Sequence, residues 1–256
     1  MSFPLPYAVP AANLLPASLA PLTDEFGALP VLHIWTLVRR EAQVQGGLVR
    51  IPPRLGSVPL VQIAGSGDAI LWQAERQGEV PVFDNTQATA KLCAIIPTPR
   101  GVWSVLEVAR QTAALPYSWG MNSPTPGQLN LLSGIVGVGR RSVVEVNGSN
   151  SSITPYANTD ALGTVQAKAT VIDYSRKEVS QAINGGAFVT ATTTTAPTQM
   201  GQLIEPTDAT VQIDLGRSRA GKAFGGTLMD LMILQGDVRA MNGLWAKWNS
   251  YRSTWV

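Results

Sequence analysis

Residues that could do chemistry are scarce in this sequence. It holds one histidine, His33, and one cysteine, Cys93. His33 lies in the alternating run VLHIWTLV, and no G-x-S-x-G elbow supplies an activated serine to complete a catalytic triad. Cys93 lies in KLCAII without a CxxC partner, which is typical of a buried, inert thiol. We therefore expect a core or subunit-interface histidine, no catalytic residue, no metal site and no cofactor.

One segment approaches a nucleotide-binding motif. Gly216 to Ala223 reads GRSRAGKA, which matches GxxxxGK, but Ala223 stands where a Ser or Thr should hold Mg²⁺. Only about thirty residues follow, too few for the parallel α/β sheet that normally carries such a loop. The segment is therefore predicted to be a mobile basic turn.

Seven tryptophans could supply stacking surfaces for sugars or bases. Five of them lie in strand or helix patterns and are expected to be core or interface anchors. Trp119 and Trp255 are the freer candidates for stacking. The five expected anchors are Trp35, Trp72, Trp103, Trp245 and Trp248.

The composition narrows the class of protein. Charged residues make up 14% of the 256 residues, against a usual share of about 25%. A monomer covers its surface largely with such residues, so the deficit favours a chain that buries its outside against other chains. The net charge of +2 is too small for strong nucleic-acid binding. No apolar run reaches the roughly 18 to 20 residues of a membrane span.

The chain divides into three regions. Residues 1–23 carry no charge and several prolines, which predicts an extended arm that either lies on a neighbouring subunit or wraps its own domain. Residues 24–226 are expected to form a β-sandwich region, either one unit or two stacked units split near 115–128. Residues 227–256 are expected to be a C-terminal helix and tail.

Short apolar or alternating runs, separated by turn residues, predict strands of an antiparallel sandwich or jelly roll, single and decorated or double. A spacing of three and four apolar residues predicts a short central helix over 101–114 and a helix over 227–251. The polar, proline-rich stretch 118–128 is expected to be a loop. The predicted strands are 31–38, 47–51, 58–64, 69–74, 80–83, 91–96, 129–139, 142–146, 164–174, 187–195 and 209–215.

Low charge, the proline-rich arm, many short Thr/Val/Gly strands and few catalytic residue types together resemble the virion structural proteins of bacterial viruses, capsid or tail type. The resemblance implies a non-enzymatic, self-assembling capsid subunit with a jelly-roll fold, made in the host cytoplasm and located in the virion. Its partners would be copies of itself and other virion proteins, with contact to an internal membrane as a further option and no strong nucleic-acid binding. The expected assembly-interface residues are Phe3, Tyr7, Leu14, Leu15, Leu19, Trp245, Trp248 and Trp255.

Three alternatives stay open. The chain could be a tail-tube, baseplate or decoration protein of the same kind of particle. It could be an enzyme that acts on polysaccharide or peptide through carboxylates gathered by the fold. It could also be a carbohydrate-binding β-sandwich protein, for which an exposed tryptophan platform would be the distinguishing feature.

Overall fold

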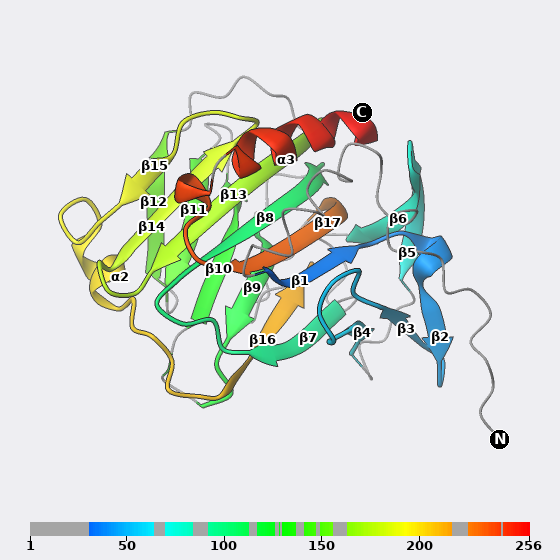
Figure 1. Ribbon diagram of the computed structural model, residues 1–256, viewed down its shortest axis with the longest axis horizontal. Coiled ribbons are helices and arrows are strands. Elements are labelled where there is room, and N and C mark those ends of the chain that lie inside the picture. The colour runs from blue at the N-terminus through cyan, green and yellow to red at the C-terminus, as the bar shows by residue number, and fades with distance from the viewer. Residues whose placement is uncertain are drawn as a thin grey trace.

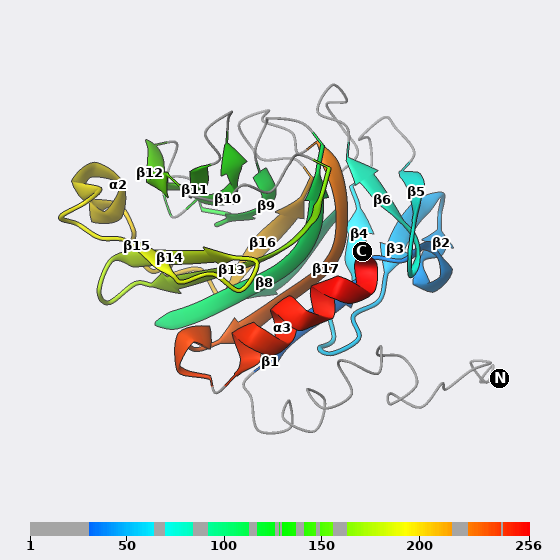
Figure 2. The ribbon, with the colours of Figure 1, turned by 90° about the horizontal axis from the view of Figure 1, so that it is seen from above.

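The protein is a sandwich of two antiparallel sheets with a helix on the outer face of one of them (Figures 1 and 2). The computed structural model describes residues 31–63, 70–83, 92–112, 117–125, 128, 130–136, 141–146, 149–155, 163–216, 225–241 and 243–256. The predicted fold class, an antiparallel β-sandwich with a C-terminal helix, is confirmed. The predicted arm at 1–23 and most of the basic segment at 216–223 lie outside the described residues.

The first sheet, sheet A, has the order β15-β14-β13-β8-β17-β6-β5, and β1 also pairs with β17. Its strands are β1 (Val31–Thr36), β5 (Leu71–Glu75), β6 (Gly78–Phe83), β8 (Val102–Gln111), β13 (Val165–Asp173), β14 (Glu178–Ile183), β15 (Val189–Ala191) and β17 (Gly226–Gln235).

The second sheet, sheet B, has the order β12-β11-β10-β9-β16-β7-β4-β3-β2. Its strands are β2 (Gln43–Gln45), β3 (Leu48–Ile51), β4 (Leu60–Gln62), β7 (Leu92–Pro97), β9 (Tyr117–Asn122), β10 (Asn130–Val136), β11 (Arg141–Val146), β12 (Ser149–Pro155) and β16 (Thr210–Leu215).

Helical elements are short and few in the described ranges. None of the helices there is long and apolar enough to cross a bilayer. Gly243, at a φ of 71°, makes the turn that starts the C-terminal helix. The elements are η2 (Arg39–Glu41), α2 (Pro197–Gly201), η3 (Val238–Ala240), α3 (Leu244–Arg252) and η4 (Ser253–Trp255).

Two apolar clusters hold the layers together. One lies between the sheets and includes Trp103, Trp119 and Ile213. The other joins the outer face of sheet A to α3 and includes Leu106 and Trp248 (Figure 2). Sheet A is therefore covered on both faces.

That double coverage explains two wrong predictions. The expected central helix at 101–114 is strand β8, and the first part of the expected helix at 227–251 is strand β17. Both strands are buried along nearly their whole length. Their sequences are therefore rich in apolar residues throughout and lack the alternation of apolar and polar residues that marks a half-exposed strand. The expected boundary at 226/227 consequently falls inside β17, and only 244–252 is α-helical.

The two sets of predicted strands do not form separate units. Each sheet takes strands from both sides of the 115–128 segment; β8, for example, pairs with β13 and β17. That segment, expected to be a loop, includes strand β9 in the middle of sheet B. The sandwich is one interleaved unit.

The expected assembly-interface residues fall into two groups. Trp248 and Trp255 are 0% and 1% exposed in the cluster beneath α3, so they stabilise their own chain. Trp245 is half-buried and its ring lies 6.0 Å from that of Phe188. The others lie outside the described residues; they are Phe3, Tyr7, Leu14, Leu15 and Leu19.

Candidate functional site

On the outer face of sheet B, β7, β16 and β9 lie side by side and carry polar side chains. In β16, Val211 and Ile213 point into the core, so the alternate residues Gln212 and Asp214 point to the outer face. Ile95 of neighbouring β7 is 61% exposed on this face.

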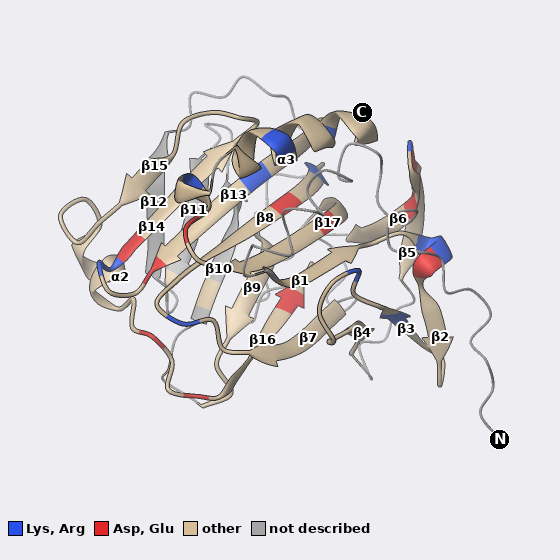
Figure 3. Cartoon of the chain, viewed as in Figure 1, with Lys and Arg blue, Asp and Glu red and all other residues tan. Residues whose placement is uncertain are grey.

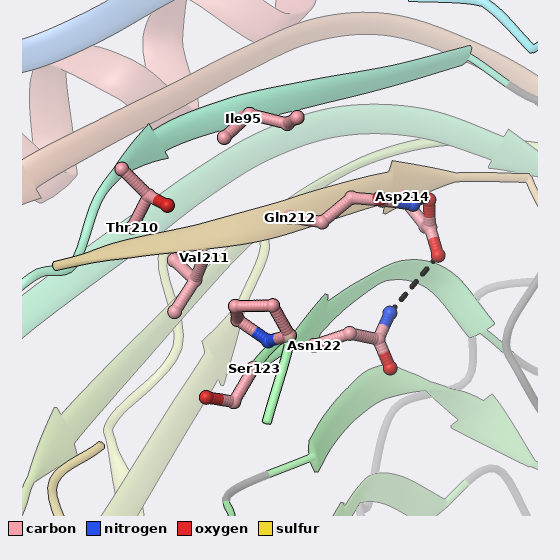
Figure 4. Close-up of a pocket in the computed structure, with 8 residues that line it drawn as sticks. Ile95, Asn122, Ser123, Thr210, Val211, Gln212 and Asp214 are labelled. Carbon is pink, nitrogen blue, oxygen red and sulfur yellow. Dashed lines mark hydrogen bonds between the residues drawn. The ribbon is translucent and has the colours of Figure 1, made fainter. Parts of the chain in front are cut away.

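A hollow of about 370 Å³ lies on this face. Its volume is at the lower end of the range for small-molecule sites. The close-up in Figure 4 shows polar side chains of β16 and β9 converging on one another, with Ile95 alongside. The lining residues are Ile95, Asn122, Ser123, Pro124, Thr210, Val211, Gln212 and Asp214.

Asp214 organises the polar floor of the hollow. Its Oδ1 accepts a hydrogen bond from Gln212 Nε2 at 2.6 Å, and its Oδ2 accepts one from Asn122 Nδ2 at 2.9 Å (Figure 4). Gly120 is the cross-strand partner of Asp214 on β9 and contributes no side chain. The space this leaves lets Asn122, which pairs with Gln212, reach diagonally to the carboxylate.

One atom of this floor lacks a partner. Asn122 is only 8% exposed, and its Oδ1 makes no hydrogen bond. Buried polar atoms are nearly always hydrogen-bonded, and a lost bond of this kind costs about 1–3 kcal/mol. This acceptor is itself buried, so a ligand donor that reached it through a small movement of its neighbours would be stabilised.

A second carboxylate, that of Asp208, stands at the rim. It accepts hydrogen bonds from Ser123 Oγ and from Thr125 Oγ1, the latter at 2.7 Å, and these bonds lower the pKa of Asp208. Thr98 Oγ1 and Arg100 Nη2 donate to its backbone oxygen at 2.6 and 2.9 Å. These bonds tie the segment before β16 to the ends of β7 and β9, which keeps the rim in place.

A different polar cluster is enclosed between the sheets. Lys168 Nζ lies 2.7 Å from Glu107 Oε1, and Ser118 Oγ donates to both Glu107 oxygens at 2.9 and 2.7 Å. A β-bulge in β9 turns Ser118 toward this cluster, because Trp119 and Tyr117 pair with successive residues of β10. All three side chains are almost completely buried, so the cluster is part of the core and offers no ligand site.

The residues singled out in the sequence lie elsewhere or play other parts. His33 is 5% exposed and stacks on Trp35 at 5.1 Å, as expected for a core histidine. Trp119 and Trp255, expected to be freer, are 2% and 1% exposed, so the stacking prediction is wrong for both. Cys93 is half-buried and pairs with Asp214 across the outer face of sheet B, not inside the core.

The described residues show neither a cluster of metal ligands nor, in the view of Figure 3, a basic surface of the kind that binds nucleic acid. No group of three or more His, Cys, Asp or Glu side chains there could hold a metal ion. In the view of Figure 3, basic and acidic residues are scattered over separate elements without a continuous basic stripe.

The residues that make the hollow were not predicted as site residues from the sequence. Asn122 and Ser123 lie in the stretch that was expected to be a loop. Gln212 and Asp214 lie in a predicted strand, and the alternation VQIDL indicates that both face away from the core. That alternation was the one local signal available for them.

No protein-family model matches the sequence, and no curated protein matches it. Among solved structures, domain 4 of AbnA, an extracellular GH43 arabinanase from Geobacillus stearothermophilus in complex with arabinotriose, has a TM-score of 0.55. The match covers 88% of this chain and 98% of that one at 13% identity, which shows a shared fold.

Two weaker matches are found among solved structures. The heptameric SAP-like pentraxin of Limulus polyphemus gives a TM-score of 0.43 at 16% identity, over 54% of this chain and 65% of that one. The CBM40 domain of Ruminococcus gnavus IT-sialidase, bound to α2,3-sialyllactose, gives 0.41 at 15% identity, over 59% and 83%.

These comparisons correct the expected virion class. The fold is shared along nearly its whole length with a domain solved with a bound oligosaccharide, and the comparisons give no indication of a capsid, phage or other virion protein. The low charge and the apolar N-terminal segment are properties of composition. Composition does not distinguish a capsid protein from another β-sandwich protein.

Proposed function

We propose that this protein is a carbohydrate-binding β-sandwich domain and that it binds sugar in the hollow on β7, β16 and β9. The observation that carries the proposal is the nine-tenths buried, unpaired Asn122 Oδ1 in a polar floor ordered by Asp214. Sugar hydroxyls are the natural partners of such acceptors. The shared fold with domain 4 of AbnA supports the proposal.

Binding without catalysis suits this floor. Glycoside cleavage ordinarily uses two carboxyl groups about 5 to 9 Å apart that face the same bond. In the described part of the lining, Asp214 is the one carboxylate, and both of its oxygens already accept hydrogen bonds from neighbouring amides. Such a group orders the site but is poorly placed to act as an acid or a nucleophile.

The apolar contact in the hollow is aliphatic. Ile95 is 61% exposed beside the polar floor, where the C–H face of a sugar ring could pack on it. Among the residues that the structure describes, none of those lining the hollow is aromatic. Because aromatic platforms supply much of the energy of sugar stacking, we expect modest affinity for a single sugar unit.

Asn122→Ala and Gln212→Ala are each expected to weaken sugar binding at least tenfold, about 1.4 kcal/mol. The reason is that each removes an acceptor from the floor and leaves Asp214 with one amide partner fewer. Isothermal titration calorimetry against a panel of pentose and hexose oligosaccharides measures the change.

Gln43→Ala is the matched control. Gln43 lies exposed on edge strand β2 of the same sheet, away from the hollow, and its loss should leave affinity unchanged. The melting temperature of each variant reports whether the fold survives. A native chain that binds no oligosaccharide of the panel, or folded Asn122 and Gln212 variants with native affinity, would refute the proposal.

The single cysteine provides a second readout on the unmodified chain. Cys93 is half-buried on the same face and is the cross-strand partner of Asp214. We expect a saturating sugar to slow its alkylation by iodoacetamide severalfold, because the ligand would cover the approach to the thiol. An alkylation rate that is unchanged at saturation would place the bound sugar elsewhere on the molecule.

A further inference from the structure

The hollow is too small to enclose a chain of sugars. Its volume of about 370 Å³ is at the lower end of the range for small-molecule sites. An oligosaccharide bound there would therefore extend past the lining onto the neighbouring surface. Ser123 marks one direction for this extension, because this lining residue comes directly after β9 and its Oγ donates to the Asp208 carboxylate at the rim.

The Asp208 carboxylate is an ordered acceptor. Its Oδ2 accepts hydrogen bonds from Ser123 Oγ and from the Thr125 amide, the latter at 3.2 Å, and its Oδ1 accepts one from Thr125 Oγ1 at 2.7 Å. A carboxylate offers about four acceptor positions, so these bonds fix its plane and leave about one position for a further donor. The hydrogen bond from Ser123, followed by those from Thr125, lowers the pKa of Asp208, so the group stays ionised at neutral pH.

The backbone that carries this carboxylate is also held in place. The guanidinium of Arg100 donates to the backbone oxygens of Pro206 and Asp208 and pairs with Glu205 at 3.3 Å. Thr98 Oγ1 donates to the same Asp208 oxygen at 2.6 Å. A ligand that binds Asp208 therefore has little ordering of the protein to oppose it.

Polar groups continue beyond the rim. Thr125 and Thr207 are exposed on either side of Asp208. Gln128 Nε2 donates to Thr207 Oγ1 at 2.7 Å, and Gln128 Oε1 accepts from the Thr207 amide at 2.8 Å. The surface next to the hollow thus carries hydroxyl, amide and carboxylate groups in fixed positions, as a second sugar ring would require.

We propose that Asp208 contacts the second unit of a bound sugar chain and makes the site select oligosaccharides over single sugars. One ring lies in the hollow, and a hydroxyl of the next ring donates to the Asp208 carboxylate across Ser123. A hydrogen bond to an ionised group is roughly twice as strong as one between neutral groups, so this contact adds appreciably to the affinity. This inference rests on the proposed function and assigns the substrate class of the same site.

A series of ligands of increasing length tests the native chain. A trisaccharide of the sugar that binds best should bind about tenfold more tightly than its monosaccharide, because only the longer ligand reaches Asp208. Calorimetry measures the trisaccharide, and displacement of bound trisaccharide measures the weaker monosaccharide.

Asp208→Asn tests the residue. The substitution keeps the shape of the side chain but removes its charge and one acceptor oxygen, so the ratio of the two affinities should fall by about fivefold. Asp237→Asn is the matched control, because Asp237 is also a hydrogen-bonded carboxylate but lies at the start of η3, after sheet A. It should leave the ratio unchanged, and the melting temperature of each variant reports whether the fold survives.

The outcomes separate this inference from the proposed function. Equal native affinity for the monosaccharide and the trisaccharide would overturn the selectivity and leave the sugar site standing. A folded Asp208→Asn variant with an unchanged ratio, including one that loses affinity for both ligands by the same factor, would show that Asp208 only holds the rim. Failure of the native chain to bind any sugar would overturn the proposed function itself.

Discussion

Lys168→Met is expected to lower the free energy of unfolding by about 3–5 kcal/mol, because it leaves a buried carboxylate without its cation. Lys168 and Glu107 lie 2.7 Å apart, and their side chains are 2% and 5% exposed. Ser118 Oγ would remain as a donor to Glu107, but a hydroxyl cannot balance a charge in the core. Urea unfolding followed by tryptophan fluorescence measures the loss.

Two comparisons test the explanation. Arg39→Met breaks an ion pair with Glu79 in which both side chains are about half exposed, and it should cost less than about 1 kcal/mol. The double variant Lys168→Met/Glu107→Met should recover most of the lost stability, because both buried charges are gone. A double variant as unstable as Lys168→Met alone would show that the cost comes from packing.

Asp230 is expected to make the protein less stable as the pH rises from about 4 to about 6. Its carboxylate accepts hydrogen bonds from Thr36 Oγ1 at 2.6 Å, Tyr251 OH at 2.9 Å and Trp255 Nε1 at 2.7 Å. Complete burial nevertheless raises its pKa to about 6, against the hydrogen bonds and the nearby charge of Arg54, which lower it.

The sign follows from proton binding. Between pH 4 and 6 the folded state holds the proton of Asp230 and the unfolded state, with a pKa of 3.8, has lost it. Raising the pH therefore favours unfolding, and two pKa units correspond to about 3 kcal/mol by pH 7. Below about pH 4 both states are protonated, and this contribution to stability is fully present.

Asp230→Asn isolates this contribution. His33 acts in the opposite direction in an overlapping range, because burial lowers its pKa and so favours folding as the pH rises. His33 is present in both the native chain and the variant, so its contribution drops out of the difference between their unfolding free energies. That difference, native minus variant, should fall by about 3 kcal/mol from pH 4 to 7. A pH-independent difference would contradict the buried-carboxylate explanation.

Asp237→Asn is the matched control for this titration. Burial alone would raise the pKa of Asp237, but the hydrogen bonds and charge of Arg239 outweigh burial and lower it, so the stability that Asp237 contributes is lost only below about pH 4. Between pH 4.5 and 7 the free energy of unfolding should therefore change with pH to the same extent in the Asp237→Asn variant and in the native chain.

Much of the β-structure could be predicted from local pattern. The short apolar run KLCAII and the alternation in VQIDL predict β7 and β16 almost to the residue. β8 and β17 could not be recognised in this way. Their two faces are covered by sheet B and by α3, so apolar residues follow one another without alternation.

Strand β9 was missed for the opposite reason. Its segment YSWGMN alternates large residues with Ser, Gly and Asn, but it is short and is followed by Pro124 and Pro126, which locally favour a loop. It becomes a strand because β16 and β10 pair with it on either side. Tertiary pairing overrides local propensity in such cases.

The sequence alone determined that the chain is a mainly β protein with few catalytic residue types, since both follow from residue counts and short-range periodicity. It also determined that Gln212 and Asp214 share one face of a strand.

Tertiary structure decided which residues meet on that face. Asn122 and Asp214 are 92 positions apart and form a hydrogen bond only because β9 pairs with β16. Composition suggested surfaces for assembly, whereas burial placed Trp248 and Trp255 beneath the chain's own helix.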